Sequence, residues 1–168
     1  MLSQTWQASL KASLNPPNKA EKPVRLAVLG IGHELCGDDA VGVRLAGMLR
    51  PLAAGKERVL VIEAGPAPEN FTGPLRRFQP DLVLLVDAAQ LDGRPGAIGW
   101  LDLQSTGGMS ASSHTLPLHI LVSYLVAELG CQVALIGIQP EQTFADGPLT
   151  ARVQAAAQEV VQALMESI

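Results

Sequence analysis

Short apolar runs alternate with amphipathic stretches along most of the chain. The first run, Arg25–Gly30, is almost wholly apolar and ends in glycine, which is typical of a strand buried on both faces. Apolar residues then recur at helical spacing, with Asp38 or Asp39 where the helix would begin. The pattern therefore predicts a strand, a loop and a helix, and the apolar stripe of that helix is Val41, Leu45, Met48, Leu49 and Leu52.

The same alternation continues to the C-terminus. Residues 104–113 are rich in Gly and Ser and are predicted to form a loop. The helix that follows them is apolar nearly all round, as expected of a helix packed under other elements. Further strands are predicted at 59–63, 82–87, 97–101 and 132–138, and further helices at 70–78, at 118–129 and behind the cap candidate Thr150.

Strands that alternate with helices predict an α/β fold. We expect a three-layer sandwich, in which helices flank both faces of a mostly parallel, twisted, five-stranded sheet. The chain has 168 residues, which is the size of one domain. We assign this domain to residues 24–168 and interpret residues 1–23 as a loosely attached, partly ordered extension with one short helix.

Composition excludes several classes of partner. The chain has 12 Lys and Arg against 16 Asp and Glu, and no stretch gathers the basic residues into a stripe, so we expect no nucleic-acid binding. The apolar runs are too short or too interrupted to span a bilayer, so we expect no membrane contact. Cys36 and Cys131 lie far apart without CxxC spacing, which favours free thiols. We expect a cytoplasmic monomer.

Candidate chemistry gathers at the predicted carboxyl ends of strands, where open α/β sheets place their sites. The loop 30–39 follows the first strand, Asp87 ends the third, and His114 stands at a helix entry. One imidazole and two carboxylates that meet at this edge would suit a divalent first-row metal with open positions. His33 and Glu34 are possible additional ligands or supporting groups.

Structural roles compete with each of these assignments. Asp38 and Asp39 could simply cap the helix that follows them, and Asp87 could serve a turn. His119 lies within an apolar helix and is interpreted as a buried core histidine. Cys36, without a basic neighbour in sequence, is interpreted as a packed thiol rather than a nucleophile.

Four segments resemble the [NiFe]-hydrogenase maturation endopeptidases, in the order in which that family carries them. The first contains Gly30-Ile-Gly32 and the pair Asp38-Asp39, and is similar to the family pattern GxGNxLxxDDGxG. The four segments are Val28–Val43, Asp81–Ala88, Ser113–Leu118, and Ile136–Pro140 with Gly147–Thr150. A further stretch, Ile62–Asn70, is most similar to the branch of the family that processes the large subunit of formate-hydrogenlyase-type hydrogenases.

The resemblance implies both an activity and a site. Family members remove a C-terminal extension from the hydrogenase large-subunit precursor after nickel insertion, and they cut after a His or Arg. Asp39, Asp87 and His114 match the nickel-binding positions of the family. The nickel belongs to the precursor, and a surrogate such as Cd or Zn is expected to occupy the same place. Asp38 is our candidate for the general base and Asp39 for a residue that acts through the ion.

Two other functions remain open on the sequence. A nickel-dependent checkpoint or chaperone module would bind the precursor without cutting it. A flavodoxin-like nucleotide-binding domain would use the Gly30-Ile-Gly32 loop, although Glu34, Asp38 and Asp39 would repel phosphate. The chain also departs from the family pattern, with His33 in place of an Asn, Glu63 in place of an Asp, and Ala64-Gly65 in place of two glycines.

Overall fold

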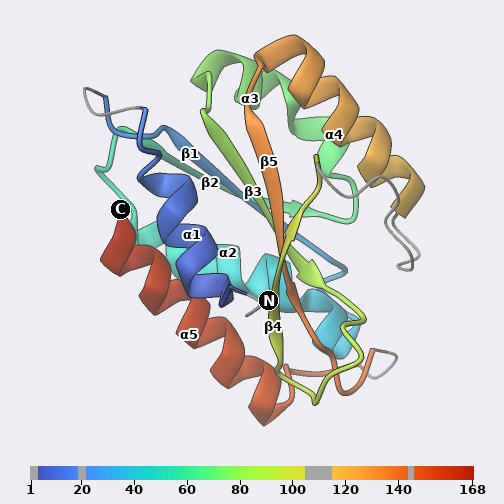
Figure 1. The fold of residues 1–168 in the computed structure, drawn as a ribbon. Helices are drawn as coiled ribbons and strands as arrows, with labels where there is room; N and C mark the ends of the chain where they lie inside the picture. Colours follow the sequence, from blue (N-terminus) through green and yellow to red (C-terminus); the bar gives the residue numbers. More distant parts are fainter. Residues whose placement is uncertain (1–3, 19–21, 105–114, 144–145) are drawn as a thin grey trace.

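The computed structural model describes residues 4–18, 22–104, 115–143 and 146–168. Within these residues, five strands form one sheet in the order β2-β1-β3-β5-β4 (Figure 1). The pairs along β2-β1-β3-β5 are parallel, and β4 runs antiparallel to β5. The mostly parallel sheet confirms the predicted α/β fold; its strands are β1 Leu26–Ile31, β2 Val59–Gly65, β3 Leu82–Ala88, β4 Ile98–Asp102 and β5 Gln132–Ile138.

Helices cover both faces of the sheet. Figure 1 shows α3 and α4 together on one side, and α1, α2 and α5 on the other. Two short 3₁₀ turns, Gly37–Ala40 and Pro68–Phe71, precede α2 and α3. The helices are α1 Trp6–Leu14, α2 Val41–Leu52, α3 Thr72–Phe78, α4 Thr115–Leu129 and α5 Ala151–Ser167.

Side chains along β1 alternate between two separate cores, because successive strand residues point to opposite faces. Leu26 and Val28 pack into the cluster that contains α1, α2 and α5. Ala27 and Leu29 pack into the cluster that contains α3 and α4. A strand buried on both faces needs an apolar side chain at every position, which explains why the sequence shows a continuous apolar run.

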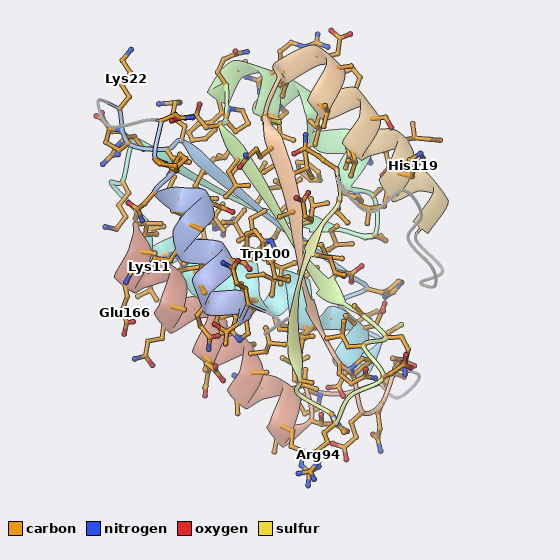
Figure 2. The ribbon with its side chains drawn as sticks, in the orientation of Figure 1. Lys11, Lys22, Arg94, Trp100, His119 and Glu166 are labelled. Carbon is orange, nitrogen blue, oxygen red and sulfur yellow. The ribbon has the colours of Figure 1, made fainter. Side chains whose placement is uncertain are left out.

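Helix α1 is packed against the domain, although we expected the N-terminal extension to be loosely attached. Its Trp6, Leu10 and Leu14 are buried and belong to the same core cluster as α5. The hydroxyl oxygen of Thr5 accepts a hydrogen bond from the Ala8 N–H at 3.3 Å and so caps the helix. In Figure 2, Trp100 of β4 lies beside α1. The helix therefore contributes to the core.

Helix α4 has one buried face, whereas we expected it to be buried nearly all round. Leu118, Leu121 and Leu125 are buried at helical spacing. Ile120 is 64% exposed, and His119 is exposed and projects outward in Figure 2. The expectation of a buried core histidine at 119 is therefore wrong, because an apolar composition does not show which face of a helix meets the sheet.

Two further expectations concern the thiols and the membrane. Cys36 is half-buried, Cys131 is buried, and both are free, as predicted. In the part of the chain that the structure describes, no helix has the length and apolar character needed to cross a bilayer.

Candidate functional site

The strand order reverses direction at β1 and β3. The chain passes from β1 to β2 on one side and then to β3 on the other, so β1 and β3 are neighbours with Gly30 paired to Val86. Connections leave the carboxyl ends of these two strands in opposite directions, which is the place where open α/β sheets carry their sites. The loop after β1 and Asp87 at the end of β3 meet at this edge, as we predicted.

The loop after β1 folds back on itself and presents Asp39. The Cys36 N–H donates to the His33 carbonyl at 3.0 Å, and the Asp39 N–H donates to the Cys36 carbonyl at 3.0 Å. Gly32 has a φ of +139°, and a Cβ built on it would lie 2.0 Å from the Asp39 carbonyl oxygen. Only glycine fits at position 32, and its contact fixes the backbone of Asp39.

Helix α2 approaches the sheet backbone directly behind this loop. A Cβ on Gly42 would lie 2.1 Å from the Val86 carbonyl oxygen and 2.2 Å from that of Ile31. A Cβ on Gly30 would in turn lie 2.1 Å from the Gly42 carbonyl oxygen. The two glycines allow the first turn of α2 to rest on β1 and β3, which brings the turn Gly37–Ala40 to the strand ends.

Asp87 is a buried carboxyl at the strand edge, with 2% of its surface exposed. Its Oδ1 accepts a hydrogen bond from the Ala88 N–H at 2.8 Å. Burial and, to a lesser extent, the nearby charge of Asp39 raise the pKa of Asp87 to about 7, against the opposing effect of the Ala88 hydrogen bond. A carboxyl of this kind holds a proton near neutral pH unless a cation takes its place.

Asp39 is half-buried and lies close enough to Asp87 for the two charges to repel. Two carboxylates that repel each other could share a cation, which would relieve the repulsion and replace the proton on Asp87. The structure thus brings together two of the three predicted metal ligands.

His114, the third predicted ligand, lies outside the described residues and directly precedes α4. His33 and Glu34, the possible additional ligands, are both exposed. Among the described residues, no group of three or more His, Cys, Asp or Glu side chains could hold a metal ion.

Asp38 is buried completely and accepts four hydrogen bonds. Its Oδ2 accepts from the N–H groups of Glu141 and Gln142, both at 2.9 Å, and from the Thr150 hydroxyl at 2.8 Å. Its Oδ1 accepts from the Thr150 N–H at 2.8 Å. One carboxylate thus holds the connection between β5 and α5 in place.

This geometry favours an anchoring role for Asp38 over the general base that we predicted. Burial alone would raise the pKa of Asp38, but the hydrogen bonds from Gln142, Thr150 and Glu141 outweigh burial and lower it. A carboxylate with a lowered pKa and occupied lone pairs is a poor proton acceptor. The alternative role as helix caps is not seen either. The N-cap position of α2 is Ala40, and no side chain, from Asp38 or Asp39, caps this helix.

Two buried polar contacts at this edge had no clear signal in the sequence. The Gln139 side chain, at the end of β5, accepts from the Leu91 N–H at 2.7 Å and donates to Gln90 Oε1 at 3.1 Å. Thr150 lies at the predicted N-cap of α5, but its hydroxyl donates to Asp38 instead of capping. The one feature of the sequence that marks Gln139 is its place, as a polar residue directly after an apolar strand.

Glu63, where the chain departs from the family pattern, lies on β2 and forms an ion pair with Arg50 of α2 at 3.2 Å. Both side chains are partly exposed, so this pair contributes little to stability. Its effect is to hold the Glu63 carboxylate against α2.

Comparisons with known proteins bear on the family and the fold of the chain. The sequence profile of the hydrogenase maturation proteases (HycI) matches residues 43–167. The hydrogenase 3 maturation protease of Escherichia coli K12 is 33% identical over 138 residues, which cover 82% of this chain and 86% of that protein. The crystal structure of a [NiFe] hydrogenase maturation protease HycI from Thermococcus kodakarensis superimposes with a TM-score of 0.82 at 32% identity, over 95% of this chain and 97% of that one. The solution structure of the endopeptidase HycI from Escherichia coli gives a TM-score of 0.69 at 30% identity, over 82% and 86% of the two chains.

Proposed function

Because the chain belongs to the hydrogenase maturation protease family, we propose that it removes a C-terminal extension from a [NiFe]-hydrogenase large-subunit precursor once nickel has been inserted. It is a peptidase by family. The observation that supports nickel recognition is the meeting of Asp39 with the buried Asp87 at the switch point of the sheet.

The precursor's own nickel would be the ion that this edge recognises. Asp39 and Asp87 offer carboxylate oxygens, and His114 offers an imidazole nitrogen, a donor set that suits a divalent first-row metal. Without the ion, burial and, to a lesser extent, repulsion from Asp39 favour a proton on Asp87. The nickel ion of a loaded precursor would replace that proton, whereas a nickel-free precursor has no ion for these side chains to bind. The protein would therefore bind the loaded precursor in preference to the nickel-free one.

Peptide hydrolysis adds one water across a C–N bond and releases the extension with a new amino terminus. We propose that the nickel polarises the scissile carbonyl or the attacking water, which is the usual contribution of a divalent ion to such a reaction. Asp39 and Asp87 would hold the ion against that bond. Asp38 takes no proton in this scheme because its oxygens are already engaged.

The test mixes purified protein with nickel-loaded and nickel-free precursor and follows the precursor by mass spectrometry. We expect a loss of mass from the C-terminus of the loaded precursor alone. Asp39→Ala and His114→Ala should each slow this loss by about 100-fold or more, because the ion then loses a ligand. His119→Ala is the matched control, since His119 is an exposed imidazole on α4 and should leave the rate unchanged.

Other outcomes would favour the other functions. A stable complex with uncut, nickel-loaded precursor would support the checkpoint or chaperone module. A nucleotide that copurifies with the protein would support the nucleotide-binding domain. A His114→Ala variant that trims at the normal rate would overturn the ligand assignment.

A cytoplasmic location and a monomeric state of the protein stay predictions.

A further inference from the structure

The buried carboxylate of Asp38 joins two segments that are far apart in the sequence. Asp38 belongs to the turn Gly37–Ala40, and its hydrogen-bond partners Glu141, Gln142 and Thr150 lie more than 100 residues later, between β5 and α5. The Asp38 N–H also donates to the Gln142 carbonyl at 2.8 Å. The backbone and the side chain of one residue therefore bind the same strand-to-helix connection.

This connection follows the strand that pairs with β3. Asp87 of β3 lies opposite Gly137 of β5, and the bound connection begins directly after Ile138. Asp39, on the other side of Asp38, already has its backbone fixed by Gly32 and Cys36. The bonds of Asp38 therefore add a second attachment, which joins the turn that carries Asp39 to the end of the strand that pairs with β3.

We infer that Asp38 is a positioning residue that sets the separation of the Asp39 and Asp87 carboxylates by fastening the turn Gly37–Ala40 to the end of β5. The inference rests on the proposed function, because it gives Asp38 a role in the ion site of that function. Asp38 itself touches neither the ion nor the precursor. Its neutral counterpart Asn cannot replace it, because one carboxamide oxygen cannot accept all four hydrogen bonds and the amide NH₂ would face an N–H or O–H donor.

The test measures the affinity of the isolated protein for Cd²⁺ by titration calorimetry, with the bare ion as the probe. We expect Asp38→Asn to weaken binding by roughly 10- to 100-fold, the range seen when a supporting group of a metal ligand is removed. Thr150→Val keeps the carboxylate and removes only the hydroxyl hydrogen bond, so its loss of Cd²⁺ affinity should be smaller than that of Asp38→Asn.

A matched control separates positioning from a general loss of stability. Asp81 also anchors backbone through its carboxylate, since its Oδ2 accepts from the Arg25 N–H at 2.9 Å, but it lies at the opposite edge of the sheet, before β3. Asp81→Asn should lower the unfolding temperature and leave the Cd²⁺ affinity of the folded protein unchanged.

Processing of nickel-loaded precursor by Thr150→Val decides between positioning and the general base. If Asp38 were the base, loss of one hydrogen bond would make it more basic, and the rate would stay the same or rise. If Asp38 positions the site, the rate falls. Because Thr150→Val keeps the charge and most of the hydrogen bonds, it decides the question even if Asp38→Asn does not fold.

The outcomes separate this inference from the function on which it rests. A folded Asp38→Asn that binds Cd²⁺ as tightly as the wild type would overturn the inference and leave the proposed function standing. An unfolded Asp38→Asn together with an unaffected Thr150→Val would do the same. A wild-type protein that neither binds Cd²⁺ nor trims loaded precursor would overturn both.

Discussion

Asp87 lies within reach of the negative charge of Asp39, and this repulsion adds to burial in raising the pKa of Asp87 to about 7. The folded protein therefore binds a proton at Asp87 more tightly than the unfolded chain does. The stabilisation from this proton is complete below pH 4 and is lost as the pH rises towards 7. At 1.36 kcal/mol per pKa unit, about 3 kcal/mol should disappear between pH 5 and pH 8.

Asp87→Asn should abolish this pH dependence, because Asn is uncharged and of similar shape. Urea unfolding of the metal-free wild type and variant at pH 5 and pH 8 measures the effect as the difference of their unfolding free energies. The pKa of Asp38 is lowered, so the pH dependence that it contributes has the opposite sign. Its stabilisation of the folded protein is lost only when the pH falls below 3.8, the ordinary pKa of an Asp, which lies outside the range from pH 5 to pH 8. Equal pH slopes for the two proteins would refute the assignment.

Gly42→Ala should destabilise the protein by about 2 kcal/mol, because the new Cβ would overlap the Val86 and Ile31 carbonyl oxygens and push α2 off the sheet. Processing should slow as well, since Val86 directly precedes Asp87. Gly73→Ala is the matched control in α3. Its Cβ would meet only the Arg77 side chain, at 3.6 Å, so it should leave stability unchanged or improve it by up to about 1 kcal/mol. Equal unfolding free energies for the two variants would contradict the close approach of α2.

Leu10→Ala tests whether α1 is part of the core. The Leu10 side chain is 1% exposed, so its truncation should lower the unfolding free energy by about 3 kcal/mol. Ile120→Ala truncates an exposed apolar side chain of α4 and should change it by less than about 0.5 kcal/mol. Denaturant unfolding of both variants gives the comparison, and a negligible effect at Leu10 would show that the helix is dispensable.

Local periodicity was enough to predict the sheet and the helices that pack on it. Leu26–Gly30 and Val133–Ile138 are continuous apolar runs because their strands are buried on both faces, and such runs can be recognised in the sequence. The rule that sites lie at the carboxyl ends of strands then predicted, from the sequence alone, that Asp39 and Asp87 lie at the same edge of the sheet.

Contacts between distant segments could not be predicted in the same way. Nothing in the pair Asp38-Asp39 indicates that the first carboxylate faces Thr150, because the partners are separated by more than 100 residues. The apolar sequence of α4 likewise concealed the exposed face that carries Ile120. In both cases tertiary packing decided which side chain is covered.

The central claim is that Asp39, Asp87 and His114 bind one ion. Crystals soaked with nickel or cadmium salts test it most directly, because an anomalous-scattering peak locates the ion independently of the protein density. The account predicts one peak within bonding distance of an oxygen of Asp39, an oxygen of Asp87 and an imidazole nitrogen of His114. A peak elsewhere, or carboxylate oxygens too far apart to reach a common atom, would contradict it.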